Sequence, residues 1–280
     1  MQILLASAKL MRETSAETGL PLSRPRFQDQ AESFARELGR FSVEHLGELF
    51  SCSGKIAALN KSRFQIFGTD EAELMPAILA YNGQAYKHLR ADIMTREDLL
   101  WANAHLFISS CMYGLLRPLD VINQYRMDGS FTLAACKGGV GAARASKVNE
   151  FWRPLLTDVL IEEVRRDDGV LLYLDTEEFR SLFDWKRVSG ELHIIEPSFH
   201  IAKTDSSSGV LRVTTPSVWA KTCRGAMARY VICERISNPA LLEAFSYEGF
   251  GFDSGLSTEG HPVFVRKQEA ISGSDARRSV

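Results

Sequence analysis

Three short apolar segments set the strongest constraint on the fold of this chain. Gln2–Ala6, Leu106–Met112 and Val170–Leu174 are five to seven residues long. This length suits buried strands and is far below the ~20 apolar residues of a membrane-spanning helix. Helical patterns lie between them, at about 27–38, 96–105 and 148–166. We place the start of the third nearer Arg153, because Pro154 suits only a first helical turn. Strands that alternate with helices predict an α/β (mixed α+β) fold.

The size of the chain predicts one domain. Its 280 residues include 45% hydrophobic ones, which is enough for a full core. No composition shift marks a linker, so we expect a single compact domain over 1–268. The polar stretch 269–280 is expected to be a disordered tail.

Charge and cysteine usage restrict the class of protein. A net charge of −2 and a pI of about 6.3 exclude a chain-wide attraction to nucleic acid or anionic membrane, so any such attraction must come from a local patch. The N-terminus lacks a basic region ahead of its apolar residues, which argues against a secretory signal. The five cysteines are scattered without a CxxC, which favours reduced thiols and a cytoplasmic location. No metal-ligand spacing or nucleotide fingerprint appears, so we expect no metal and no cofactor.

The helix predicted from about Ser217 to Ile236 carries two cations near its start. Lys221 and Arg224 fall in its first two turns, opposite a face led by Trp219 and Cys223 that we assign to the core. Gly225 and Ala228 share the face of the two cations. Cations near the positive end of a helix are mildly unfavourable unless an anion binds there. The pattern therefore indicates either a phosphate or carboxylate site or a solvated basic face.

A turn at Tyr113–Asp120 is the second feature. Pro118 forces Arg117 out of helical geometry. Either Arg117 and Asp120 hold one another across the turn, or Arg117 faces a ligand and Asp120 orients it. Arg126, just after Tyr125, would add charge to the same rim.

Weaker features leave their alternatives open. The segment 137–147 is rich in glycine and basic residues but is not a Walker motif, so it is either a phosphate cradle or a surface loop. Glu177 and Glu178 open a short helix, where acids stabilise the helix dipole. Cys111 is either a reactive thiol or a buried one.

Several segments, taken in order and spacing, resemble the YaaA family of bacterial peroxide-stress proteins over about residues 2–267. The segments are Ala8-Lys9, the run from Lys55 to Phe64, Gly83–Tyr86, Tyr113–Asp120 with Tyr125-Arg126, Phe151-Trp152, Ala220-Lys221, Arg224-Gly225 with Arg229, and Glu248-Gly249 with Phe252. Relative to the family pattern, the chain lacks a proline before Ala8 and has Asn82-Gly83-Gln84 in place of Lys-Gly-Asp. These departures suggest a specialised relative with an altered ligand.

The resemblance implies a YaaA-type domain with a central basic cleft and a helix-hairpin-helix-like element. In this chain the element would be Val43–Phe67, with its hairpin at Ser53-Gly54. It would present Lys55, Lys61 and Arg63 to phosphates of nucleic acid with little base readout. The cleft would bind phosphate or another anion through the basic residues Lys9, Arg117, Arg126, Lys221, Arg224 and Arg229.

Two classes of function follow. The first is a nucleic-acid-binding protein that protects the cell against peroxide. The second is an enzyme that acts on a small anionic or nucleotide-like metabolite in a specialised biosynthetic pathway. For the second, the candidates for proton transfer or nucleophilic attack are Lys9, Tyr113, Asp120, Glu178 and Lys221. The sequence assigns neither a substrate nor an oligomeric state.

Overall fold

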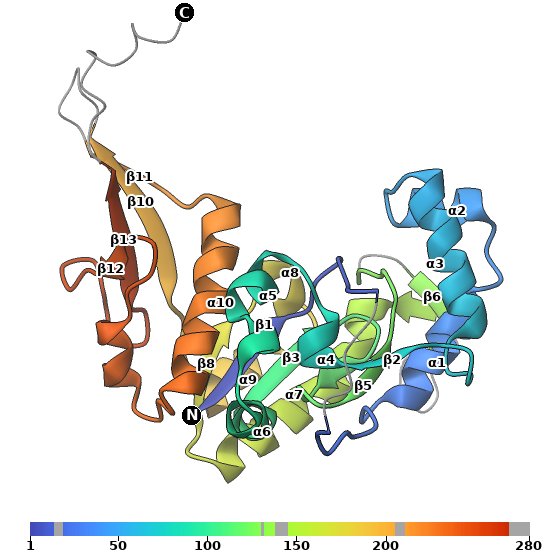
Figure 1. The fold of residues 1–280 in the computed structure, drawn as a ribbon, viewed down its shortest axis with the longest axis horizontal. Helices are drawn as coiled ribbons and strands as arrows, with labels where there is room; N and C mark the ends of the chain where they lie inside the picture. Colours follow the sequence, from blue (N-terminus) through green and yellow to red (C-terminus); the bar gives the residue numbers. More distant parts are fainter. Residues whose placement is uncertain (14–18, 130–131, 138–144, 205–210, 269–280) are drawn as a thin grey trace, which may run out of the picture.

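The three apolar segments form the centre of one sheet in the computed structural model (Figure 1). The structure describes residues 1–13, 19–129, 132–137, 145–204 and 211–268. The sheet has five strands in the order β4-β3-β1-β8-β9. Four of them are parallel, namely β1 (Gln2–Ala6), β3 (Leu106–Ser110), β8 (Val170–Leu174) and β9 (His193–Ile195), and β4 (Gly114–Leu116) is antiparallel at the edge. The predicted α/β fold is confirmed.

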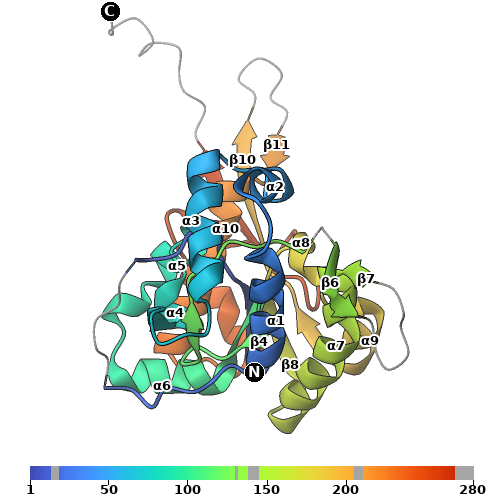
Figure 2. The ribbon, with the colours of Figure 1, turned by 90° about the vertical axis from the view of Figure 1, so that its right-hand side faces the viewer.

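Helices cover both faces of this sheet, which explains why its central strands are apolar throughout. Figure 2 shows α7 (Val148–Arg166) and α9 (Trp185–Glu191) on one side and α5 (Gln84–Leu89), α6 (Arg96–His105) and α10 (Ser217–Cys233) on the other. As a result Ile3, Leu4 and Leu5 of β1 are each 1% exposed or less.

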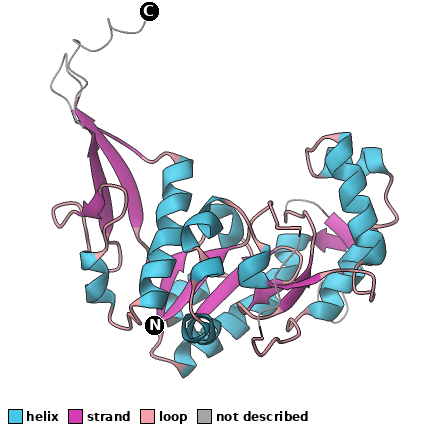
Figure 3. Ribbon diagram, viewed as in Figure 1, coloured by secondary structure: helices cyan, strands magenta, loops and turns pink. Residues whose placement is uncertain are grey.

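A second, four-stranded sheet lies on the far side of α10 (Figure 3). Its strand order is β11-β10-β13-β12, with bounds Leu211–Thr214, Ser198–Thr204, Val263–Gln268 and Phe250–Phe252. Helix α10 contacts β10 on one side and β1 and β8 on the other. It is therefore buried between two sheets rather than exposed along one face.

Helices α5 and α10 cross at very close range. A Cβ atom on Gly225 would lie 1.9 Å from the carbonyl oxygen of Ala85, so only glycine fits there. Gln84 adds a side-chain hydrogen bond to Thr222 at 2.8 Å. Gly225 and Ala228, which share a helix face with Lys221 and Arg224, are therefore buried against neighbouring elements.

Three helices form the other end of the molecule, α1 (Gln28–Leu38), α2 (Val43–Leu49) and α3 (Gly54–Ile66). The Ser42 hydroxyl accepts the amide of His45 and begins α2. Helix α3 buries Ala57, Asn60 and Phe64. Helices α2 and α3 contact each other across the short segment 50–53, within the region where a helix-hairpin-helix-like element is expected.

The remaining elements are short. They are β2 (Leu74–Pro76), α4 (Ala77–Ala80), η1 (Ala91–Ile93), β5 (Val121–Asn123), β6 (Thr132–Lys137), β7 (Ala145–Lys147), α8 (Glu177–Arg180) and η2 (Pro239–Ala244). The expected tail at 269–280 and the centre of the glycine-rich segment, 138–144, lie outside the described residues. Within the described ranges, no helix has the length and apolarity needed to cross a membrane.

Candidate functional site

A cleft of about 640 Å³ opens where β1 and β8 end. The segments that follow these strands, 5–10 and 174–179, form part of its wall, and α5, α10 and residues 125–127 form the rest. Ligands of parallel sheets bind at the carboxyl ends of the strands, because the loops that leave those ends converge there. The cleft thus occupies the position that the fold favours for binding.

Four basic side chains line the cleft together with two acidic ones. Lys9 follows β1, Arg126 follows Tyr125, and Lys221 and Arg224 come from α10, whereas Glu177 and Glu178 belong to α8. The ammonium of Lys9 lies 4.0 Å from the Asp128 carboxylate. The structure therefore brings Lys9, Arg126, Lys221 and Arg224 together from three distant parts of the chain.

Arg224 is a cation on the cleft without a direct hydrogen-bond or ion-pair partner among the described residues. Its side chain is half-buried, and its guanidinium makes no hydrogen bond or ion pair with the part of the chain that the structure describes. Burial lowers the pKa of Arg224, and the nearby Asp175 carboxyl opposes that effect. A guanidinium has five donors, and leaving them unpaired in a partly desolvated position is costly. Arg224 therefore contributes hydrogen-bond donors without a direct partner to the lining of the cleft.

Asp175 lies beneath the cleft, directly after β8. It is 1% exposed, and it accepts hydrogen bonds from the Ser109 hydroxyl and, at 2.6 Å, from the Thr176 amide. Burial raises the pKa of Asp175 to about 7, although the hydrogen bonds from Ser109 and Thr176 and the charge of Arg224 act in the opposite direction. The pKa of Asp175 therefore lies near neutral pH, and the guanidinium of Arg224 is one of the charges that act on it.

Two tyrosines, Tyr86 and Tyr125, line the cleft, and Tyr81 lies behind them against Tyr125. The Tyr125 hydroxyl lies 2.7 Å from that of Tyr81 and 2.6 Å from that of Ser110. The Tyr86 hydroxyl, in contrast, is buried and finds no hydrogen-bond partner among the residues that the structure describes. Burial raises the pKa of all three phenols, so they remain neutral donors at physiological pH.

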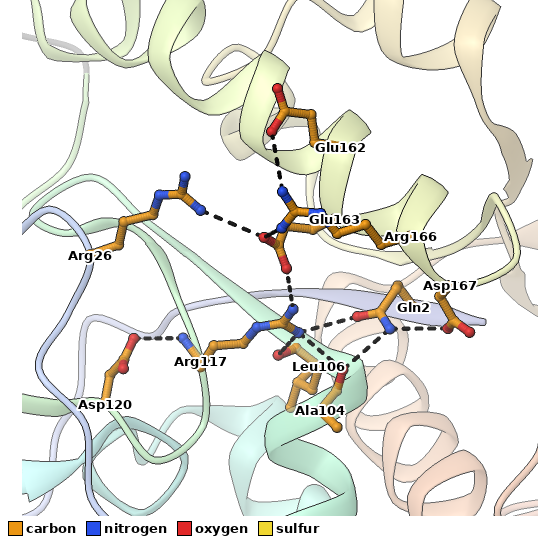
Figure 4. Close-up of polar contacts among 10 residues, drawn as sticks. All are labelled: Gln2, Arg26, Ala104, Leu106, Arg117, Asp120, Glu162, Glu163, Arg166 and Asp167. Atoms are coloured by element: carbon orange, nitrogen blue, oxygen red, sulfur yellow. Dashed lines mark hydrogen bonds and ion pairs between the residues drawn. The ribbon is translucent and has the colours of Figure 1, made fainter.

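Arg117 lies at the opposite end of the sheet, which corrects the expectation that it joins the other cations (Figure 4). Its guanidinium donates to the Gln2 side chain at 3.1 Å and to the Leu106 carbonyl at 3.5 Å, where β1 and β3 begin. It also pairs with Glu163 of α7 at 3.0 Å and stacks on Phe107, 3.6 Å from the ring centre. Arg117 therefore fastens α7 to the amino ends of the strands.

Asp120 and Tyr113 also lie away from the cleft. The Asp120 carboxylate accepts the Arg117 amide at 2.8 Å and the Ser23 hydroxyl at 2.7 Å, so it holds the backbone of Arg117 and not its guanidinium. The Tyr113 hydroxyl is buried and accepts the Asn123 amide at 2.9 Å. Neither can reach a molecule in the cleft, and we withdraw both as candidates for proton transfer.

Arg229 closes the end of α5. Its guanidinium donates to the backbone carbonyls of Arg90 at 3.1 Å and Leu89 at 3.4 Å. These carbonyls terminate the helix, and a cation stabilises that end of the helix dipole. The position explains Arg229 as a contact between α10 and α5 outside the lining of the cleft, rather than as a ligand-binding residue.

The three basic side chains of α3 differ in their burial and in their hydrogen-bond partners. Lys61 donates to the carbonyls of Phe41 at 2.5 Å and Gly39 at 3.3 Å, just after α1. Arg63 is half-buried, and burial lowers its pKa. Lys55 is exposed in the first turn of α3. These residues lie on the α2–α3 pair, which is a separate surface from the cleft (Figure 1).

Cys111 is a buried thiol. It is 3% exposed, and burial raises its pKa far above the usual range. Its backbone carbonyl accepts the Trp152 indole N–H at 2.7 Å. Because the thiolate is the reactive form, this environment makes Cys111 unreactive. In the described ranges, no group of three His, Cys, Asp or Glu side chains is arranged to hold a metal ion.

Comparison with known proteins gives one consistent result. The sequence matches the family model described as "Peroxide stress protein YaaA" over residues 1–256. A UPF0246 protein of Phocaeicola vulgatus is 40% identical over 264 residues, which cover 94% of this chain and 98% of the relative. A UPF0246 protein of Bacteroides thetaiotaomicron is 38% identical, with 95% and 98% covered. One of Caulobacter vibrioides is 32% identical, with 96% and 100% covered.

Proposed function

Because the chain belongs to the YaaA family of peroxide stress proteins, we propose that its cleft binds a small anion bearing a phosphate or carboxylate group. The family description supports a role in the protection of the cell against peroxide, and we include that role in the proposal. The observation that carries it is Arg224, a half-buried guanidinium on the cleft that has no partner within the described residues. Lys221, one turn earlier on α10, is an exposed cation on the same cleft.

The dimensions of the cleft favour a small molecule over a polymer. A volume of about 640 Å³ falls in the range of pockets that enclose small organic ligands. The net charge of −2 provides no long-range attraction for a polyanion. The cations gather in one concave site, where low dielectric strengthens their interaction with a single anionic group.

Calorimetry on paired variants tests this proposal. We expect wild type to bind inorganic phosphate or adenosine 5′-monophosphate, and Lys221→Ala/Arg224→Ala to lose that binding. The Tm of the double variant without ligand should stay within about 2 °C of wild type, because neither side chain makes a hydrogen bond or ion pair with the described chain. Arg36→Ala/Lys186→Ala removes the same charge from exposed positions on α1 and α9 and serves as the control. Equal affinity in wild type and Lys221→Ala/Arg224→Ala would overturn the proposal.

Catalysis on the bound anion is an extension of the same proposal. Lys9, Glu178 and Lys221 remain on the cleft as groups that can move protons. Incubation of wild type with an extract of small metabolites, followed by mass spectrometry, should then show one anion consumed and one product formed. Lys221→Ala/Arg224→Ala should leave that anion unchanged, and an extract unaltered by wild type would refute catalysis.

Nucleic-acid binding by α2 and α3 is the second candidate function. The two helices form the expected pair, and Lys55 is exposed at the start of α3. Lys61 already holds two carbonyls, so Lys55 and Arg63 would supply the phosphate contacts. With so few contacts, affinity should be weak and should fall as salt rises.

Fluorescence anisotropy with a mixed-sequence duplex separates the two surfaces. Binding at 50 mM salt that weakens at 200 mM, and that Lys55→Ala/Arg63→Ala reduces, would support this function. Lys221→Ala/Arg224→Ala should then leave duplex binding unchanged. The absence of binding at 50 mM salt would exclude it.

A further inference from the structure

The hydroxyl of Tyr86, a residue that lines the cleft, is a buried hydrogen-bond donor without a partner among the described residues. Tyr86 is 4% exposed, lines the cleft, and has no partner for its hydroxyl. The neighbouring hydroxyls of Tyr81 and Tyr125 are both paired. Across the described residues, the other buried side-chain atom without a partner is the amide nitrogen of Asn123, which lies outside the lining of the cleft. A buried donor without a partner destabilises the fold unless a ligand pairs with it.

The crossing of α5 and α10 places this hydroxyl on the same cleft as Arg224. Gly225 touches the backbone of Ala85 so closely that no side chain fits between them. Tyr86 and Arg224 are the chain neighbours of those two residues, and both line the cleft. Helices α5 and α10 thus each contribute to the lining of the cleft one residue whose donor group has no direct partner among the described residues.

The chemistry of these two groups defines what they bind. A neutral phenol and a guanidinium both donate hydrogen bonds, so they suit oxygen acceptors and reject cations and amines. Phosphate and carboxylate oxygens fit best, because hydrogen bonds to charged acceptors are the stronger ones. The lining also includes the apolar side chains of Leu5, Ala6, Met127, Leu174 and Phe179. They suit a flat or apolar body.

We propose that the cleft takes an organic oxyanion with a flat, apolar body, and that an oxygen of its anionic group binds the Tyr86 hydroxyl and the Arg224 guanidinium together. This inference rests on the proposed anion-binding function and deepens it. Tyr86 becomes a ligand-binding residue, and the class of ligand narrows from any small anion to one with an apolar or aromatic portion.

Calorimetry with three probes tests the class of ligand. Adenosine 5′-monophosphate should bind at least tenfold more tightly than inorganic phosphate, because its base reaches the apolar walls. It should also bind at least tenfold more tightly than adenosine, which lacks the anionic group. Adenosine binding as tightly as the monophosphate, or phosphate binding as tightly as the monophosphate, would overturn the assigned class.

The variant Tyr86→Phe tests the residue. It should weaken binding of adenosine 5′-monophosphate tenfold or more, the usual effect of losing a hydrogen bond to a charged group. Its Tm without ligand should equal or exceed that of wild type, because an unpaired buried hydroxyl is removed. Tyr230→Phe is the matched control, since the Tyr230 hydroxyl reaches the Leu241 carbonyl outside the cleft. It should not change the affinity.

The outcomes distinguish the role of Tyr86 from the anion-binding function on which it rests. Unchanged affinity in Tyr86→Phe, together with loss of binding in Arg224→Ala, would overturn the role of Tyr86 and leave the anion-binding function standing. Unchanged affinity in Arg224→Ala, or no binding of phosphate and adenosine 5′-monophosphate by wild type, would overturn both. A fall of several degrees in the Tm of Tyr86→Phe would also overturn the inference, because the hydroxyl would then have a partner within the fold.

Discussion

Replacement of Asp175 by asparagine should stabilise the protein in a way that depends on pH. The carboxyl is 1% exposed, and burial raises its pKa from 3.8 to about 7. In the unfolded chain the same carboxyl ionises near pH 4. The folded state therefore binds a proton that the unfolded state has released between about pH 4 and pH 7, and wild-type stability falls as pH rises through that window. Asparagine is neutral throughout and avoids this loss.

The magnitude follows from the size of the shift. A rise of about three units corresponds to about 4 kcal/mol of lost stability above pH 7. With an unfolding entropy typical of a chain of 280 residues, this energy equals roughly 7 °C in Tm. We expect the Tm of Asp175→Asn, relative to wild type, to increase by about that amount between pH 4 and pH 8. Any difference in hydrogen bonding with Ser109 adds a constant offset and leaves the pH dependence intact.

Differential scanning fluorimetry from pH 4 to pH 8 measures this difference. The control is Asp70→Asn, because Asp70 is exposed, and its difference from wild type should stay constant. If the difference for Asp175→Asn is also constant between pH 4 and pH 8, the carboxyl is ionised throughout and the reasoning is refuted.

Three further predictions follow from contacts outside the floor of the cleft. Gly225→Ala should lower Tm by several degrees and weaken adenosine 5′-monophosphate binding, because its Cβ would clash with the Ala85 carbonyl; unchanged Tm would contradict the close crossing. Glu163→Ala should destabilise by about 1–2 kcal/mol, since it removes the carboxylate partner of Arg117 but leaves its hydrogen bonds to Gln2 and Leu106, yet calorimetry should find unchanged ligand affinity; weakened binding would place Arg117 in the site. Cys111 should resist iodoacetamide in the folded protein at pH 8, as followed by mass spectrometry, because it is 3% exposed and burial raises its pKa; rapid labelling would contradict its burial.

The elements of the fold followed from patterns that are local in sequence. Apolar runs of five residues predicted β1 and β8, because a strand buried on both faces needs no polar positions. Helix α7 spans Val148–Arg166, the range of its sequence pattern, and does not start nearer Arg153, so it contains Pro154 in its interior. Proline costs a helix one hydrogen bond, and the packing of this long helix against the sheet and α9 outweighs that cost. Local propensity could not reveal this compensation.

The face of a helix that contacts a neighbour was harder to predict. The wheel of α10 correctly grouped Cys223 with the core, but Gly225 and Ala228 are equally buried because a second neighbour, α5, covers them. In α3, the apolar side chains of Ile56 and Leu59 are 41% and 48% exposed. Periodicity identifies an apolar face, whereas the number of neighbours depends on contacts between segments distant in the chain.

The direction of the strands explains which predicted residues met and which did not. Lys9 follows the end of β1, and Asp175 follows the end of β8, so both lie at the edge where the carboxyl ends of parallel strands converge. Arg117 follows β4, which runs antiparallel to β3, and the chain has then returned to the amino ends of the central strands. The sequence identified Arg117 as a candidate, but the reversal of chain direction between β3 and β4 places it at the amino ends of the central strands. Applied to the sequence, the same rule would have identified Asp175, because a carboxylate directly after a buried parallel strand falls at the binding edge. Tyr86 has no such signal, since its unpaired hydroxyl results from the contact between α5 and α10, which only the folded chain creates.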